Sequence, residues 1–218
     1  MAGTGKVYGS IATEILSEVA DYYSAKLAEH GETPRGVDWN GEESQVLRFE
    51  QLGKVIDRSA GFSLTDLGCG YGALFEYLRP RYRDFSYIGC DVSGDMVRAA
   101  RDRYATSTNA RFTVAAEPPE ATDYGVASGI FNVRLGRSDT EWRDYLEATL
   151  DLLNRTNRLG FAFNCLTSYS HEDKMREYLY YADPCLLFDL CKRRYSRNVA
   201  LLHDYGLYEF TIIVRRDL

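Results

Sequence analysis

The chain has 218 residues, of which 45% are hydrophobic and 27% charged, and its formal net charge at pH 7 is −6. This length fits one domain, or one domain with a small cap, and the composition argues against a disordered or fibrous protein. The acidic balance argues against non-specific binding to nucleic acid or to an anionic membrane, because clustered Lys and Arg supply the affinity there.

Neither a targeting segment nor a metal site is indicated. The N-terminus lacks an apolar core followed by a cleavage site, and no apolar run approaches about 18 residues, so we expect no signal peptide and no transmembrane helix. The five cysteines are odd in number and include no C-x-x-C pair, which suits neither a zinc site nor a disulfide framework. We expect reduced thiols, a cytoplasmic location and no metal ion.

The first part of the chain, residues 1–60, is expected to form a helical cap or lid. Apolar residues at near-helical spacing predict helices over 11–29 and 42–58. The residues between them, His30 to Gly36, contain two glycines and a proline, which break the helical pattern.

From residue 61 to 218 the chain is expected to form an α/β core, because strand-like and helical patterns alternate. Helices are predicted over about 72–79 and 94–104, and a third follows the capping box of Ser138 and Glu141. The predicted parallel strands are 62–67, 85–90, 111–115, 124–131 and 159–164.

The tail differs from this alternation. Residues 171–195 are expected to be helical, with a break near Asp183-Pro184. Two strand-like runs, 198–203 and 208–214, are joined by a short turn and predict an antiparallel hairpin at the edge of the sheet.

A glycine-rich turn, Asp66-Leu67-Gly68-Cys69-Gly70-Tyr71-Gly72, follows the first strand of the core. Such a turn lets the backbone approach a ligand closely, and a carboxylate at the end of the next strand, Asp91, suits the two hydroxyls of an adenosine ribose. The segment also satisfies a generous dinucleotide fingerprint, so a nucleotide-dependent oxidoreductase stays open. Asp66 weighs against it, since its carboxylate repels a pyrophosphate and suits the cationic end of S-adenosylmethionine.

The segments DLGCGYG and IGCDVSGDMVRAAR resemble motifs I and II of class I S-adenosylmethionine-dependent methyltransferases. The resemblance covers residues from about 62 to 166, and the terminal hairpin is similar to the reversed last strand of that family. It implies a Rossmann-like fold with a seven-stranded, mostly parallel sheet and helices on both faces. It also implies S-adenosylmethionine as cofactor and S-adenosylhomocysteine as product.

The resemblance also implies roles for individual residues. Asp66 is expected at the methionyl amino group, Asp91 at the ribose hydroxyls, and Gly129 and Asn132 beside the reaction centre. For Met96, a core position on its helix is an equal alternative to a contact with the adenine. The remaining candidates for cofactor binding within the motifs are Gly68, Cys69, Gly70, Val92, Met96 and Glu117, of which Glu117 is expected near the adenine amino group.

The helical cap offers two further cofactor contacts. The ring of Tyr22 or Tyr23 suits a cation–π contact with the sulfonium, and Arg48 suits the methionyl carboxylate. The alternative is that both tyrosines pack in the interior and Arg48 is a surface cation.

Methyl transfer is an in-line displacement that needs alignment and exclusion of water, and it needs a base only for some acceptors. His203 and His171 are therefore candidates for a base or a substrate contact. The alternatives are a hairpin residue bonded to backbone for His203 and a solvated helix start for His171.

The sequence thus predicts a methyltransferase acting on a small molecule at oxygen or nitrogen, without nucleic acid or membrane as partner. Three alternatives stay open. The first is an RNA or protein methyltransferase, which a basic face around Arg193 and Arg197 joined to the active site would favour. The others are the oxidoreductase and a non-catalytic binding module, in which the acceptor cavity is plugged.

Overall fold

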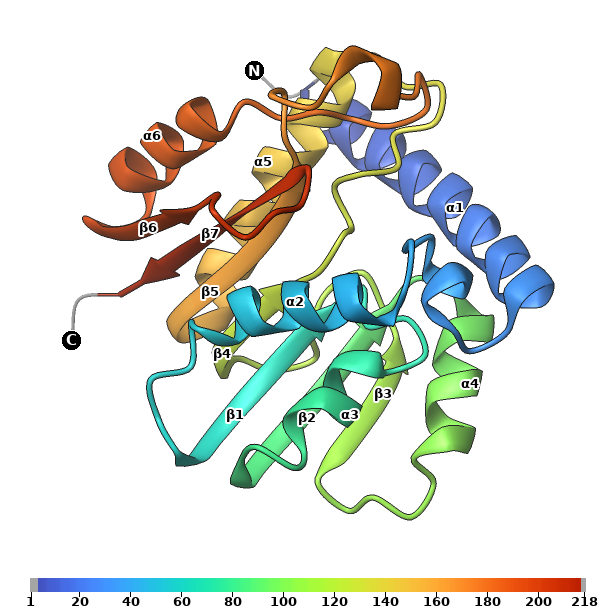
Figure 1. Cartoon of the computed structure of the whole chain (residues 1–218), viewed down its shortest axis with the longest axis vertical. Helices are drawn as coiled ribbons and strands as arrows, with labels where there is room; N and C mark the ends of the chain where they lie inside the picture. Colours follow the sequence, from blue (N-terminus) through green and yellow to red (C-terminus); the bar gives the residue numbers. More distant parts are fainter. Residues whose placement is uncertain (1–3, 217–218) are drawn as a thin grey trace.

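The computed structural model describes residues 4–216, with side chains described from residue 13. Seven strands form one sheet in the order β3-β2-β1-β4-β5-β7-β6 (Figure 1). The first five strands run parallel, and β7 is antiparallel to both of its neighbours, which confirms the predicted sheet with its reversed edge. The strands are β1 Ala60–Leu67, β2 Arg83–Asp91, β3 Ala110–Val114, β4 Thr122–Ala127, β5 Asn157–Leu166, β6 Asn198–Leu202 and β7 Glu209–Arg215.

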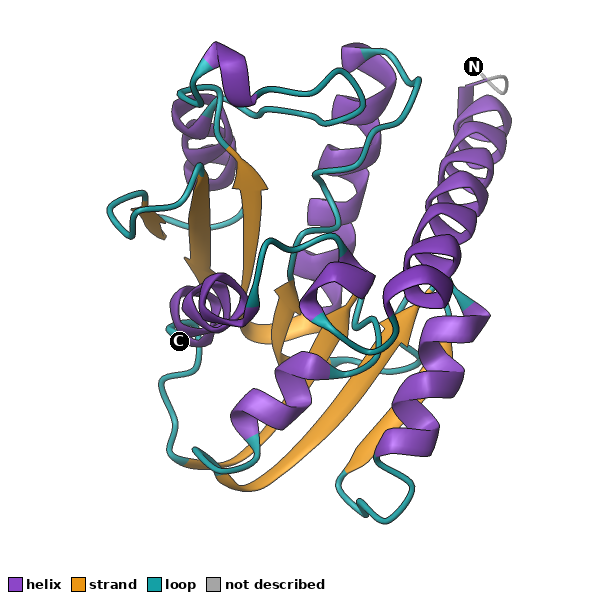
Figure 2. Cartoon of the chain, turned by 45° about the vertical axis from the view of Figure 1, so that its right-hand side comes forward, coloured by secondary structure: helices purple, strands orange, loops and turns teal. Residues whose placement is uncertain are grey.

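Helices cover both faces of the sheet (Figures 1 and 2). The helices α2, α3 and α4 pack on one face, and α5 and α6 pack on the other. No described helix combines the length and the apolar character needed to cross a membrane. The helical elements are α1 Thr4–His30, η1 Pro34–Val37, α2 Glu42–Gly53, α3 Ala73–Leu78, α4 Gly94–Arg103, α5 Asp139–Thr156, η2 Glu172–Lys174 and α6 Pro184–Arg194.

The alternation of side chains along the strands divides the interior into two cores. In β5, Phe161 and Phe163 point to the core under α5 and α6, whereas Ala162 points to the core under α2, α3 and α4. The core under α2, α3 and α4 is rich in aromatic rings, with Phe62 stacked on Phe85 at 5.4 Å between centroids. Burial on both faces explains why the strands read as nearly continuous apolar runs.

Three predicted elements differ from the structure. The helix predicted over 42–58 ends at Gly53. The strand predicted over 124–131 ends at Ala127, because Gly129 adopts a positive φ of 76° and the chain turns there. The helix predicted over the first part of 171–195 is wrong, since that part contains only the short 3-10 helix η2. The backbone there bonds to the turn after β4 instead: the amides of Arg134 and Leu135 both donate to the carbonyl of Tyr178.

The long helix α1 lies across the carboxyl edge of the parallel strands, beside α4 (Figures 1 and 2). The Tyr22 hydroxyl donates to Asp38 at 2.8 Å, and the hydroxyls of Ser24 and Ser93 lie 2.8 Å apart. Because ligands of open α/β sheets bind at this edge, α1 stands over the expected site.

Candidate functional site

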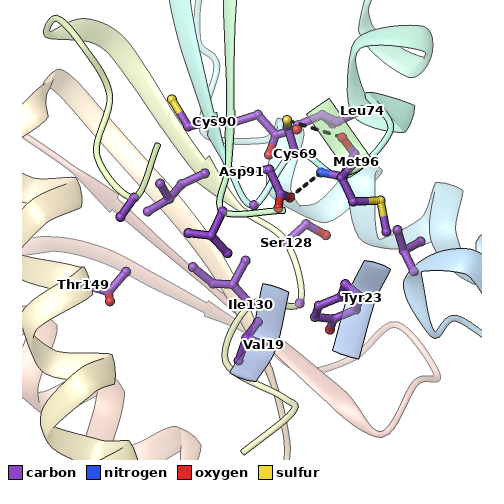
Figure 3. A pocket seen from close by; sticks show the side chains of 18 of the residues that line it. Val19, Tyr23, Cys69, Leu74, Cys90, Asp91, Met96, Ser128, Ile130 and Thr149 are labelled. Atoms are coloured by element: carbon purple, nitrogen blue, oxygen red, sulfur yellow. Dashed lines mark hydrogen bonds between the residues drawn. The ribbon is translucent and has the colours of Figure 1, made fainter. Parts of the chain in front are cut away.

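A cavity of about 310 Å³ opens between the glycine turn, α1 and α5, and we refer to it as the first cavity. Figure 3 shows Cys69 and Asp91 on one side of it and Val19 and Tyr23 of α1 on the other, with Ile130 between them. The structure therefore brings together residues that the sequence analysis assigned separately. The predicted residues that line it are Tyr23, Asp66, Gly68, Cys69, Gly70, Asp91, Val92, Met96, Glu117 and Gly129.

The glycine turn uses its own amides within the fold. The amides of Gly68 and Cys69 both donate to the carbonyl of Cys90, at 2.7 and 3.0 Å, and the amide of Gly70 donates to Asp91 Oδ2 at 2.8 Å. A Cβ on Gly68 would lie 2.1 Å from Ile130 Cγ2, which explains why glycine is needed there. A pyrophosphate requires free amides at such a turn, so this geometry argues against a dinucleotide.

The carboxyl group of Asp66 lies at the base of the first cavity and is only 2% exposed. Its Oδ2 accepts a hydrogen bond from the Tyr87 hydroxyl at 2.5 Å, whereas its Oδ1 has no hydrogen-bond partner. Burial raises the pKa of Asp66 to about 7, against the lowering effect of the Tyr87 hydrogen bond. A buried carboxylate oxygen without a donor is rare, and a cationic N–H group in the cavity is its natural partner.

The carboxylate of Asp91 stands at the end of β2. It accepts hydrogen bonds from the amide of Ser93 to Oδ1 at 2.9 Å and from the amide of Gly70 to Oδ2 at 2.8 Å. Burial raises the pKa of Asp91, while these backbone hydrogen bonds act to lower it. Since a carboxylate offers about four acceptor positions, each oxygen can still accept from a hydroxyl in the cavity.

The outer end of the first cavity is lined by Val92 and Met96 on one side and by α5 on the other. Glu117 stands at the rim with its side chain 63% exposed, and it forms an ion pair with Arg155 at 2.8 Å. The sequence did not indicate that α5 contributes to the cavity through Tyr145, because nothing in its pattern distinguishes a residue that faces a ligand from one that faces the core.

The residue before α2 that the sequence analysis missed is Trp39. Its ring covers the turn after β4 so closely that a Cβ on Gly129 would lie 2.5 Å from Trp39 Cζ2. The guanidinium carbon of Arg48 lies 3.8 Å from the centroid of the same ring, a cation–π contact. The sequence did contain one sign of this role. Trp39 lies in a loop between two glycines, Gly36 and Gly41, where neither helical nor strand periodicity explains a large aromatic residue.

The guanidinium group of Arg48 is occupied by a partner far away in the sequence. Arg48 Nε donates to Glu209 Oε2 at 2.8 Å and Nη2 donates to Oε1 at 2.7 Å, and both side chains are almost completely buried. The alternative of a surface cation is therefore wrong. Arg48 also does not line the first cavity, in contrast to its expected place at the methionyl carboxylate.

A second cavity of about 590 Å³ adjoins the first and shares Tyr23, Val37 and Trp39 with it. Arg48 and Asn132 line this second cavity. The side chain of Asn132 is 5% exposed, and its Oδ1 accepts from the amide of Leu166 at 3.1 Å. Asn132 therefore lies beside the first cavity rather than within it.

Neither candidate histidine lines either cavity. The ring of His203 packs against Tyr169 and Phe210, at 5.9 and 6.0 Å between centroids. His171 precedes η2, and its Nδ1 lies 3.1 Å from the Tyr208 hydroxyl oxygen. The structure therefore gives no support to a catalytic base at either position.

A family model described as a methyltransferase domain matches residues 64–156. A protein of Mycobacterium tuberculosis named as a candidate methyltransferase is 61% identical over 163 residues, which cover 75% of this chain and 98% of that protein. The trans-aconitate 2-methyltransferase of Afipia carboxidovorans is 37% identical over 103 residues, or 43% of this chain, and the match spans 40% of the length of that enzyme.

Solved structures share the fold. A complex of DhpI with SAH has a TM-score of 0.62 at 13% identity, with 94% of this chain and 98% of that chain covered. This likeness concerns the fold alone, whereas the match to nearly the whole of the mycobacterial protein concerns the sequence. Together with the glycine turn and the reversed edge of the sheet, these findings show that the chain belongs to the class I S-adenosylmethionine-dependent methyltransferase family.

Proposed function

We propose that this protein transfers a methyl group from S-adenosylmethionine, bound in the first cavity, to an oxygen or nitrogen of a small molecule without a metal ion. The observation that carries the proposal is the unpartnered Oδ1 of buried Asp66 beside a glycine turn whose amides are already engaged. This combination suits a ligand that presents a cation to the base of the cavity, as the methionyl ammonium does.

The residues that line the first cavity suit the successive parts of this cofactor, from the methionyl end to the adenine. Asp66 would hold the ammonium group and Asp91 the ribose hydroxyls, while Val92 and Met96 would flank the adenine. Gln45, which also lines the cavity one helical turn before Arg48, is a neutral donor for the methionyl carboxylate. When bound, the cofactor supplies a methyl group already activated by a positively charged sulfur.

The chain's own residues would align the reactants and exclude water at the junction of the two cavities. Trp39 covers Gly129 there, and Tyr23 borders both cavities from α1. A ring face beside a sulfonium is a favourable cation–π arrangement. The cap predicted over residues 1–60 belongs to the same proposal, since α1 and α2 both contribute to the walls.

The open second cavity supports catalysis rather than a binding module, because an acceptor has room beside the cofactor site. A macromolecular acceptor is less well supported. Arg193 lies on α6 in an ion pair with Asp189, and neither Arg193 nor Arg197 lines either cavity. The basic cluster is therefore not continuous with the proposed active site. A cytoplasmic location is consistent with the five free cysteines.

The proposed function is tested by calorimetric titration of the purified protein with S-adenosylmethionine, S-adenosylhomocysteine and NADH in parallel. We expect dissociation constants in the micromolar range for the two sulfur compounds, about −8 kcal/mol, and no binding of NADH. Binding of NADH without the sulfur compounds would overturn the proposal.

A further inference from the structure

We propose that the second cavity binds the methyl acceptor as an ionised carboxylic acid, and that the methyl group goes to one of its carboxylate oxygens. The inference rests on the proposed function, since it assumes S-adenosylmethionine in the first cavity. The second cavity, at about 590 Å³, lies within the range of about 300–1,000 Å³ that small-molecule sites occupy. A molecule bound there lies next to the first cavity, at the junction formed by Tyr23, Val37 and Trp39, which line both cavities.

A buried cationic donor without a partner is the first observation behind this inference. Arg48 is 6% exposed and lines the second cavity, and two of its nitrogens are bonded to Glu209. The third, Nη1, has no hydrogen-bond partner. Guanidinium N–H groups are strong donors to carboxylate oxygens, so a carboxylate bound in this cavity would supply the acceptor that Nη1 lacks.

The charges around the second cavity also favour an anion. Its two acidic residues, Asp38 and Glu209, are neutralised within the protein. Lys26 pairs with Asp38 at 3.1 Å, and Arg48 pairs with Glu209 at 2.7 Å. Neither carboxylate therefore presents an unbalanced negative charge to a ligand.

Two further cations, Lys174 and Arg176, line the same cavity from the segment around η2. Lys174 lies 3.3 Å from Asp173 in an exposed ion pair. Arg176 donates to the backbone carbonyls of Asp173 and Met175, and no carboxylate of the described residues forms an ion pair with it. The uncompensated charge of Arg176 gives the cavity a net attraction for anions.

Among the described residues that line the second cavity, no side chain stands ready as a base, which points to an acceptor that is already ionised. Neither His171 nor His203 lines either cavity, and the two acidic residues of the second cavity are held in ion pairs. A carboxylate needs no base. Its oxygen attacks the methyl carbon, an O–CH₃ bond forms as the S–CH₃ bond breaks, the bonding pair stays on sulfur, and no proton moves.

The acceptor class is tested with the full chain and S-adenosylmethionine against a chemically diverse panel of small carboxylic acids, including trans-aconitate, citrate, benzoate and hexanoate. Each acid is paired with its neutral amide, and phenols and amines complete the panel. We expect release of S-adenosylhomocysteine with at least one acid and a methyl ester as product, and no turnover of the matching amide. Turnover confined to amides, phenols or amines, or no turnover of any acid, overturns the inference.

Charge-removing variants test the assignment to this cavity. For the acid that is turned over, Arg176→Gln and Lys174→Gln should each raise KM about fivefold, because they remove attraction for the anion. Affinity for S-adenosylmethionine should stay within about twofold in both. The matched control is Arg193→Gln, which removes an exposed cation outside both cavities and should leave KM unchanged. An equal KM in all of these variants and the wild type overturns the assignment.

The role of the buried guanidinium is tested with Arg48→Lys, which keeps a cation beside Glu209 but removes the Nη1 donor. We expect a roughly tenfold rise in KM for the acid with little change in kcat. If this variant does not fold, Arg176→Gln still tests whether the acid binds in the second cavity, because the exposed side chain of Arg176 contributes little to stability. A chain that fails to bind S-adenosylmethionine refutes the proposed function, whereas one that binds it and turns over no acid refutes only this inference.

Discussion

The side chain of Asp66 lies at the base of the first cavity, where it is buried and only one of its two oxygens accepts a hydrogen bond. Burial raises its pKa to about 7. Since this value lies above that of the unfolded chain, the protonated form favours folding. The stability that it contributes is fully present below about pH 4 and is lost as the pH rises through about 7.

Replacement of this carboxyl group by an amide is expected to raise the stability of the protein and to weaken its binding of the cofactor. At pH 8, Asp66→Asn should raise the free energy of unfolding of the ligand-free protein by roughly 1–3 kcal/mol, because no buried negative charge remains. The same variant should bind S-adenosylmethionine about 10–100-fold more weakly, because a charged hydrogen bond is lost. Urea denaturation and calorimetry measure the two effects.

The pH dependence provides the control for this prediction. Below about pH 7 the affinity of the wild type for S-adenosylmethionine should fall as Asp66 becomes protonated, by up to about tenfold per pH unit. The variant Asp66→Asn should lose this dependence, and Asp95→Asn, at an exposed site on α4, should retain it. A pH profile that is identical in the wild type and in Asp66→Asn would exclude the assigned role.

For individual residues, the sequence predicted correctly those contacts whose two partners lie close together along the chain. Asp66, Gly70 and Asp91 lie within one strand–turn–helix–strand unit, so their spacing predicts that they meet. Arg48 was misassigned because its partner, Glu209, lies 161 residues away and no local pattern joins them. Likewise, the sequence made His203 a candidate, but it could not indicate that the ring packs against Phe210.

The turn between β1 and α3 depends on glycine for a steric reason. Gly68 has a φ of 78°, and a Cβ there would meet Ile130 Cγ2 at 2.1 Å. We expect Gly68→Ala to lower the free energy of unfolding by roughly 2–4 kcal/mol, through the strained φ and the overlap together. Urea denaturation monitored by circular dichroism measures this change.

The matched control is Gly53→Ala at the last residue of α2. No atom lies within 4 Å of a Cβ at that position, and no positive φ is required there. Alanine should therefore leave stability unchanged or raise it by up to about 1 kcal/mol, as its higher helix propensity allows. Equal losses in the two variants would contradict the steric explanation.

The elements that the sequence predicted best are those that their own residues define. The capping box at the start of α5 and the break predicted near Asp183-Pro184 are examples. At that break α6 begins, and the side chain of Asp183 accepts from the amides of Cys185 and Leu186. The segment before α6 was predicted wrongly because its backbone hydrogen bonds go to residues after β4. Such tertiary pairing overrides a local helical pattern and leaves no trace in periodicity.

At the scale of the whole molecule, α1 contributes few of its described side chains to the hydrophobic interior. Among its described side chains only Ile15 is a fully buried hydrophobic residue, at 1% exposure. The ion pair of Arg137 with Glu18 and the hydrogen bond between Ser24 and Ser93 add polar contacts that water can replace. Elements of this kind open most readily in solution.

Binding of the cofactor is therefore expected to stabilise α1 more than the rest of the molecule. In hydrogen exchange with mass spectrometry, S-adenosylmethionine should slow the exchange of amides in α1 and in the loop around Trp39, which border the first cavity. Amides of α6, which lies away from that cavity, serve as the internal control. Slowed exchange confined to the glycine turn would show that α1 does not act as a lid.

The order of the strands also has a consequence for synthesis on the ribosome. β7 follows β6 in the chain but lies between β5 and β6 in the sheet, so β6 has no neighbour to pair with until β7 emerges. Glu209, the first residue of β7, is translated 161 residues after Arg48. A nascent chain can thus complete the glycine turn while the guanidinium beside Trp39 still lacks its counter-ion, and we expect turnover to begin only after β7 has been inserted.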